Sequence, residues 1–72
     1  MTYEEFRNEV LEKANNREHY IRLGQFVFNY IDAKYGVARV VQFKDRVDCF
    51  HRDDLIEEFI KCCYKRIYGV NK

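Results

Sequence analysis

The spacing of apolar residues over positions 20–33 predicts an amphipathic helix at the centre of the molecule. On helical geometry one side of this stretch is apolar and consists of Tyr20, Leu23, Val27, Tyr30 and Ile31, with Ile21 and Phe28 widening it. The other side is polar and consists of Arg22, Gln25, Asn29 and Asp32. A helix with so broad an apolar side has neighbours on more than one side. We expect it to span residues 18–35 and to end at Gly36.

Two further helices are predicted on either side of this central one, at residues 3–14 and 54–68. Thr2 and Glu5 have the spacing of a capping box, in which each side chain bonds the backbone amide of the other. Asp54 followed by Glu57 has the same spacing and is expected to begin the last helix. From the apolar faces we expect a core that includes Phe6, Val10, Leu23, Val27, Tyr30, Ile31, Phe50, Leu55, Phe59 and Cys63.

The segment between the second and last helices has two interpretations. Residues 37–42 can form a short helix, or residues 38–50 can form a two-stranded hairpin that turns at Lys44 and Asp45. The hairpin is disfavoured because this turn contains no glycine, and an isolated hairpin is marginally stable. We therefore predict a short helix at 37–42 followed by an extended loop.

Composition agrees with a single all-α domain over residues 1–72. The chain has no proline and three glycines, so it contains few helix breakers, and its six tyrosines and six phenylalanines supply apolar surface. Thirteen basic and twelve acidic residues nearly cancel, which argues against an acidic DNA mimic and against a strongly cationic nucleic-acid binder. We predict three helices with a short extra helix between the second and the third.

The sequence also predicts a cytoplasmic protein with reduced thiols. Its start has neither a basic segment nor an apolar run, and no stretch has the length and hydropathy of a membrane span. Cys49, Cys62 and Cys63 are odd in number, and adjacent cysteines rarely bridge each other. Since Cys62 and Cys63 point in different directions on a helix, they are expected to be packing residues, and we predict no metal site and no cofactor.

A pattern over residues 20–60 resembles a group of small proteins encoded by bacteria and phages. Its matching positions are Arg22-x-Gly24-Gln25-x-x-Phe28-Asn29 and, after a gap, Asp48-x-Phe50-x-x-Asp53. Cys49 and His51 stand where the group has proline and tyrosine. The resemblance implies an all-helical fold and a helical segment at 37–42. It implies no activity, but its genomic setting suggests an accessory protein of a phage or mobile element that binds and modulates a host factor.

No constellation in the sequence indicates catalysis, and we predict that the chain is not an enzyme. Asp48, Cys49 and His51 are neighbours in one loop, but a nucleophile, its base and an orienting group must converge in space. The three glycines are isolated and form no phosphate-binding loop. A chain this short also has little core in which to enclose a pocket.

The polar stripe Arg22, Gln25 and Asn29 has both a structural and a functional interpretation. It can fasten the loop at 43–53 to the central helix, with Arg22 bound to the carboxylate of Asp48 or Asp53. It can also be a surface for a protein partner. In that case the predicted partner-binding residues are Arg22, Gln25, Phe26, Asn29 and Tyr68, with the two aromatic residues as anchors.

The function that these observations favour is a small protein-interaction module with an unidentified protein partner. The alternative is a helix-turn-helix-like regulator that binds nucleic acid. Its phosphate contacts would be Arg39, Lys44, Arg46 and Arg52. The alternative is weaker, because Glu57 and Glu58 would repel phosphates at the start of the last helix.

Overall fold

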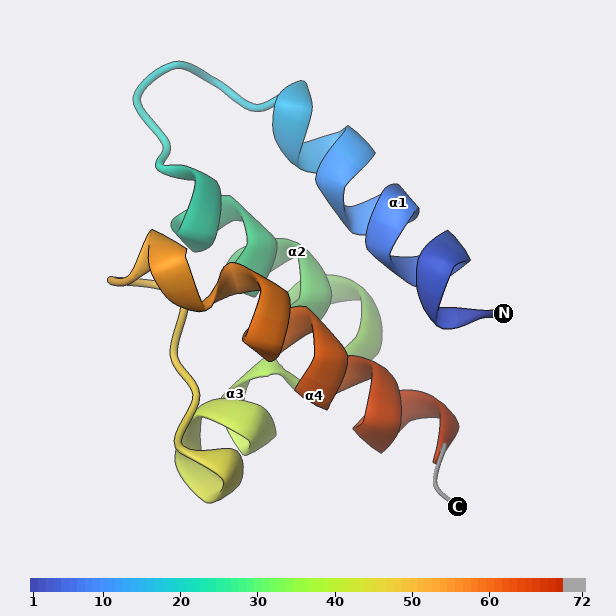
Figure 1. Cartoon of the computed structure of the whole chain (residues 1–72). Helices are drawn as coiled ribbons and strands as arrows, with labels where there is room; N and C mark the ends of the chain where they lie inside the picture. The colour runs from blue at the N-terminus through green and yellow to red at the C-terminus, as the bar shows by residue number, and fades with distance from the viewer. Residues whose placement is uncertain (70–72) are drawn as a thin grey trace.

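Three helices form where the apolar periodicity is strongest, and a short fourth one packs against two of them (Figure 1). The computed structural model describes residues 1–69. Its long helices are α1 (Tyr3–Asn15), α2 (Leu23–Tyr35) and α4 (Ile56–Tyr68), and the short helix is α3 (Ala38–Val40), extended by the wider turn η1 (Val41–Asp45). No strand occurs in the described part of the chain. The predicted all-α fold with a short helix between the second and last long helices is therefore confirmed.

The first helix begins as its sequence predicts. The Thr2 hydroxyl accepts a hydrogen bond from the Glu5 amide at 3.2 Å, and the Thr2 amide donates to the Glu5 carboxylate at 2.9 Å. Both bonds satisfy amides that a helix start leaves without partners.

The central helix begins later than predicted, at Leu23 rather than near residue 18. The guanidinium group of Arg17 donates to the carbonyls of Ala14 and Ile21 at 2.9 and 2.7 Å, so it holds the connection in a compact turn instead of a helix. Tyr20 consequently lies outside the apolar face, with 83% of its surface exposed. At the other end, Gly36 adopts a left-handed conformation and ends α2 as predicted.

The hairpin alternative for residues 38–50 is wrong, because α3 and η1 make residues 38–45 helical. Ala38 and Val41 are fully buried on the inner side of this segment. The segment ends at Arg46, which adopts a left-handed conformation with φ 60° although it is not a glycine. A non-glycine residue in this conformation carries a conformational cost.

The last helix starts with a tight turn, η2 (Asp53–Leu55), and Asp54 does not cap it. The carboxylate of Asp54 instead accepts from the Arg52 guanidinium at 2.7 Å. Glu57 is bound by Arg7 of α1, at 2.9 Å from Nε to Oε1. The predicted capping pattern at residues 54–57 is therefore wrong, since both carboxylates have arginine partners.

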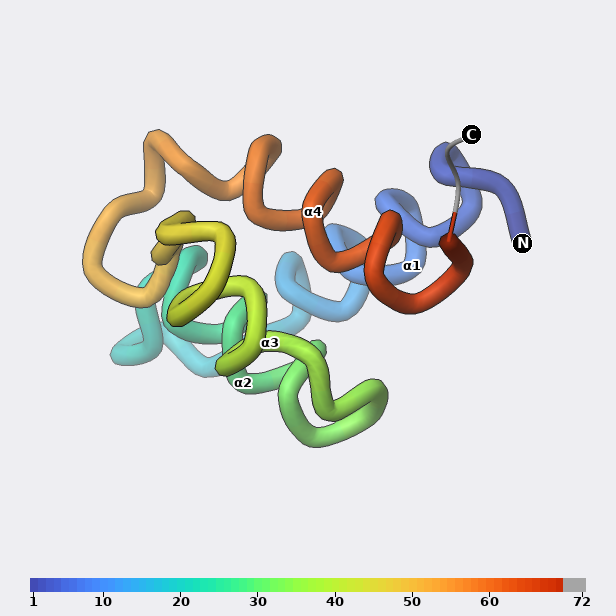
Figure 2. The backbone as a smooth tube through the Cα atoms, turned by 90° about the horizontal axis from the view of Figure 1, so that it is seen from below, coloured from blue at the N-terminus to red at the C-terminus, as the bar shows by residue number. Residues whose placement is uncertain are grey.

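The core lies between α1, α2 and α4, and α3 covers part of it from the side opposite α1 (Figures 1 and 2). Of the predicted core, six residues are buried, and they are Phe6, Val10, Val27, Ile31, Phe59 and Cys63. The other four pack against the core while partly buried, and they are Leu23, Tyr30, Phe50 and Leu55. The buried hydrophobic residues that the prediction left out are Ala14, Phe28, Ala38, Val41, Val47, Cys49, Ile56 and Ile60.

One carboxylate joins α1 to the last turns of α2. Glu9 accepts hydrogen bonds from Lys34 at 2.6 Å, Tyr30 at 2.7 Å and Tyr35 at 3.1 Å. The hydrogen bond from Lys34, followed by those from the two tyrosines, lowers the pKa of Glu9 below its ordinary value. The charged form of Glu9 is therefore the form that holds the two helices together.

None of the helices within residues 1–69 combines the length and the apolar character that a membrane span requires.

Candidate interaction surface on the third helix

The outer face of α3 and η1 presents a phenylalanine to solvent. Ala38 and Val41 use the inner face of this short segment, so the side chains between them point outward. Phe43 is 80% exposed, which makes it one of the two most exposed large apolar residues of residues 1–69, together with Tyr20. Tyr20 lies in the connection between α1 and α2, at the opposite end of the molecule from α3 (Figure 1).

Phe43 stands between two surface hollows. The larger has a volume of about 550 Å³ and is lined by Phe28, Asn29, Arg39, Gln42, Phe43, Phe50 and His51. The smaller has a volume of about 480 Å³ and is lined by Gln42, Phe43 and Arg46. The two hollows with the Phe43 ring between them are called the Phe43 surface below.

The larger hollow has an aromatic wall supported by the core. The rings of Phe28 and Phe50 meet edge to face, with centroids 5.6 Å apart. Phe28 also stacks on the buried Phe59 at 5.5 Å. Such pairs add to the free energy of burial, so the wall is fixed by the same contacts that hold α2 to α4.

The loop that brings Phe50 and His51 to this hollow is fastened to the start of α2. Asp53 accepts a hydrogen bond from the Gly24 amide at 3.0 Å, and the Cys49 thiol donates to the Gly24 carbonyl at 3.4 Å. The Arg22 guanidinium donates to the carbonyl of Phe50. Because α2 has no cap from its own N-cap side chain, the carboxylate of Asp53 supplies the missing acceptor for one free amide of the helix start.

Of the three residues of the predicted polar stripe, only Arg22 fastens the loop to α2. Its partner is a backbone carbonyl rather than the carboxylate of Asp48, which instead accepts from the Phe50 amide at 2.9 Å. The side chains of Gln25 and Asn29 form no hydrogen bond with any residue that the structure describes. Asn29 lies at the rim of the larger hollow.

Of the two predicted aromatic anchors, Phe26 lies one turn after Arg22 on α2, and only Tyr68 is distant from it. The Phe26 ring is half-buried and stacks on Tyr30, with centroids 6.0 Å apart. Tyr68 is 39% exposed and packs on Phe6 at 6.3 Å, at the end of α4 far from the start of α2 (Figure 1). Tyr68 is therefore separated from the other four predicted partner-binding residues, which lie along the first two turns of α2.

Three of the four basic residues predicted for nucleic acid do lie together, on α3, η1 and the residue that follows. Arg39 makes a long ion pair with Asp32, at 3.5 Å, and is 79% exposed at its side chain. Lys44 and Arg46 have no ion pair among residues 1–69. Arg52 lies outside this segment, just before η2, and makes an ion pair with Asp54.

The positions of Phe43, Gln42 and His51 on one surface were not predicted from the sequence. The signal for Phe43 is present in the sequence, because a helix that buries positions 38 and 41 must turn position 43 outward. It becomes visible only once residues 38–45 are known to be helical, since the hairpin alternative gives position 43 a different environment.

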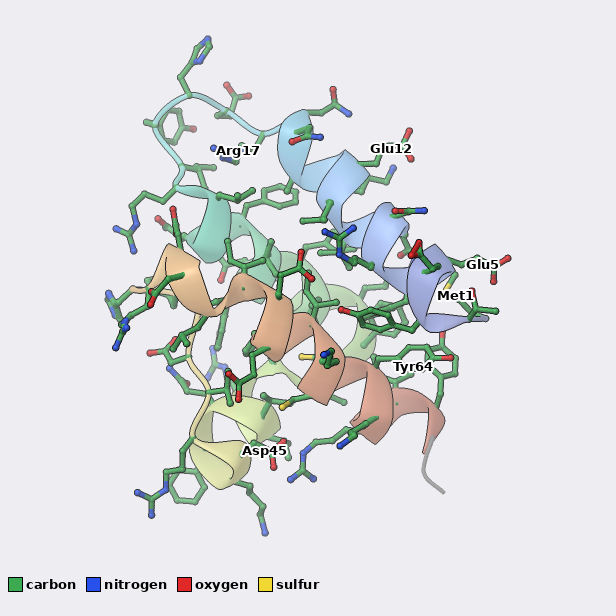
Figure 3. All side chains as sticks on the ribbon, viewed as in Figure 1. Met1, Glu5, Glu12, Arg17, Asp45 and Tyr64 are labelled. Atoms are coloured by element: carbon green, nitrogen blue, oxygen red, sulfur yellow. The ribbon has the colours of Figure 1, made fainter. Side chains whose placement is uncertain are left out.

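The two buried thiols, of Cys49 and Cys63, are protonated in the fold. Burial raises the pKa of Cys49 to about 12 and also raises the pKa of Cys63, so both thiols stay protonated. A third hollow lies beside Cys62, and its lining includes Arg66 and Asp45, which form an ion pair at 2.9 Å. Figure 3 shows Asp45 on η1. No three metal-binding side chains come together within residues 1–69.

Comparison of the chain with protein-family models, with curated proteins and with solved structures finds no match.

Proposed function

We propose that the chain is a small protein-interaction module that binds a segment of a partner protein at the Phe43 surface. The observation that carries this proposal is the exposure of Phe43 beside a hollow with an aromatic wall. Burial of a phenylalanine side chain contributes roughly 1.5–3 kcal/mol. Because the Phe43 side chain is 80% exposed, it contributes little of this free energy to folding, and most of it can be gained when a partner buries the ring.

The layout of the Phe43 surface supports binding rather than catalysis. Its centre is aromatic, through Phe28, Phe43 and Phe50, and its rim is polar. Protein interfaces have this distribution, with aromatic residues and arginine enriched at their energetic centres. A hollow of about 550 Å³ is large enough for one bulky side chain of a partner and part of its backbone.

The alternative function, binding of nucleic acid, is supported by the position of Arg39, Lys44 and Arg46 on one short segment. Three cations give weak phosphate binding, and one of them already has an acidic neighbour in Asp32. Glu58 adds a negative charge at the start of α4, where Asp54 and Glu57 are each paired with an arginine. These charges favour a protein partner over nucleic acid.

The resemblance of residues 20–60 to phage-encoded proteins adds a biological setting to this proposal. In that setting the partner is a host protein whose activity the module modulates. The resemblance stays a prediction, and the proposed binding does not depend on it.

A displayed library of random peptides tests the proposal without knowledge of the partner. We expect the wild-type chain to enrich a consensus of peptides and Phe43→Ala to lose it. Tyr20→Ala is the matched control, because Tyr20 is as exposed as Phe43 but lies in the α1–α2 connection. Both variants are expected to melt within a few degrees of the wild type, since exposed substitutions change stability by about 0.5 kcal/mol or less. Peptides that bind Phe43→Ala as well as the wild type would overturn the proposal.

A further inference from the structure

We infer that the segment bound at the Phe43 surface is an acidic peptide with one bulky apolar side chain, which enters the larger hollow. This inference rests on the proposed function and adds the chemistry of the ligand. It follows from the charges, the unpaired polar groups and the shape of the surface.

The charged residues that line the two hollows are arginines, of which Arg39 makes a long ion pair with Asp32 at 3.5 Å. Arg39 lines the larger hollow and Arg46 the smaller, and neither has an aspartate or glutamate among its lining residues. The hollow beside Cys62 differs, since Asp45 and Glu58 line it. Because Arg46 has no ion pair among the residues described, its guanidinium group is available to a carboxylate in a bidentate geometry.

The rim also carries polar groups that suit a peptide backbone. Asn29, Gln42 and His51 line the larger hollow, and none of their side chains hydrogen-bonds to another of residues 1–69. Amide and imidazole groups can donate to carbonyls and accept from amides. A peptide that crosses this rim in an extended form can therefore satisfy its backbone groups as its apolar side chain is buried.

The shape of the surface separates an apolar subsite from a charged one. Phe43 divides the larger hollow, walled by Phe28 and Phe50, from the smaller hollow that contains Arg46. An apolar side chain in the larger hollow leaves the neighbouring residues of the same peptide beside Arg39 on one flank and Arg46 on the other. The left-handed Arg46 fixes the direction in which the chain leaves η1, and its exposed side chain borders the smaller hollow.

A second copy of the chain is a poorer occupant. The outer face of α1 is acidic, through Glu4, Glu5 and Glu12, two of which are labelled in Figure 3. However, the exposed large apolar residues among residues 1–69 are Met1, Tyr20, Val40, Phe43 and Tyr68, and none belongs to α1. Met1 is the exposed apolar residue nearest to these glutamates in the sequence, and it is held against the end of α4 by hydrogen bonds from Tyr64 and Tyr68, so it is not free to act as the anchor that the larger hollow requires.

Fluorescence anisotropy with labelled probes tests the inference. The first probe is a short peptide with glutamates on both sides of one tryptophan, the second has lysines in their place, and the third is single-stranded oligothymidylate. We expect the acidic probe to bind most tightly and to weaken as salt is added, since its ion pairs are exposed. Replacing its tryptophan with serine should abolish binding.

Variants of the chain assign the two subsites. Phe43→Ala should weaken the acidic probe by about tenfold or more, as for a central aromatic residue of an interface. Arg46→Asn removes the charge of the smaller hollow but keeps a residue that tolerates the left-handed conformation, and Arg39→Gln removes the charge of the larger hollow. Each should weaken binding by about two- to fivefold. Lys61→Gln is the charge-matched control on the exposed face of α4 and should change nothing.

The possible failures are distinguishable. Equal binding of the acidic and basic peptides, or enrichment of Phe43-dependent peptides without acidic residues from the library, would overturn the inferred charge and leave the proposed function standing. Tighter binding of oligothymidylate would overturn both in favour of nucleic acid. A dimer in sedimentation that Phe43→Ala dissociates would identify a second copy as the occupant and overturn the acidic ligand.

Discussion

Replacing Gly24 with alanine is expected to destabilise the chain by about 2–4 kcal/mol, although glycine is the poorer helix former. A Cβ at this position would lie 2.0 Å from the carbonyl oxygen of Cys49 and 2.6 Å from the carboxylate of Asp53. The first of these atoms is backbone, so the loop after η1 must move away from α2. That movement breaks the hydrogen bonds that Asp53 and Cys49 make to Gly24.

The magnitude follows from two destabilising contributions and one smaller stabilising contribution. Overpacking at a close contact costs about 1–3 kcal/mol, and each lost hydrogen bond costs about 0.5–1.5 kcal/mol. Alanine returns at most about 1 kcal/mol of helix propensity. Because Gly24 is the second residue of α2, where helix formation is incomplete, the return is smaller than at the middle of the helix.

Urea denaturation followed by circular dichroism measures this effect. With a slope of about 1 kcal/mol per molar urea for a small domain, the midpoint should fall by about 2 M or more. Ala33→Gly is the control on the exposed face of the same helix, and it should lower the midpoint by about 1 M through propensity alone. A Gly24→Ala midpoint at or above that of the wild type would show that the loop does not press on α2 at this residue.

Four other outcomes follow from the structure. Phe59→Ala should cost about 3–5 kcal/mol in the same assay, because its ring is fully buried; a wild-type midpoint would contradict the core assignment. Arg22→Ala should cost about 0.5–1.5 kcal/mol, since it loses a hydrogen bond to the loop; an unchanged midpoint would indicate that this bond does not fasten the loop. Folding lowers the pKa of Glu9, so the unfolded chain binds more protons in acid, and the free energy of unfolding falls as the pH drops below about 4.3. Glu9→Gln should make this fall less steep between pH 6 and pH 3, and an equally steep fall would refute the assignment. Native protein should react with a thiol reagent at half-buried Cys62 well before the other two cysteines, and simultaneous labelling of all three would contradict their burial.

The helices were predictable because their causes are local. The Thr2–Glu5 capping box and the stop at Gly36 depend on residues within one turn of each other. The start of α2 was not predictable in the same way. Tyr20 continues the apolar periodicity, but the bonds from Arg17 to backbone carbonyls on both sides of the turn outweigh it.

The cap of the last helix and most of the candidate site could not be predicted, because both depend on contacts between residues that periodicity does not relate. Asp54 and Glu57 have capping spacing, yet arginines at positions 52 and 7 compete for them, and Arg7 lies on another helix. The hollow beside Phe43 joins residues of α2, η1 and the following loop, which periodicity within one element does not relate. Of the predicted partner residues, only Asn29 reaches that hollow, and of the predicted phosphate contacts, Arg39 does.

The direction in which the Phe43 side chain points depends on the number of residues in the wider turn Val41–Asp45. A turn of this kind holds one residue more than the ordinary helical repeat, and such turns are short insertions within helices. Deleting one residue after Val41 would restore the ordinary repeat and rotate the following side chains around the helix axis. A lineage that gains or loses one residue here would re-aim its aromatic side chain in a single step, without altering the buried face formed by Ala38 and Val41.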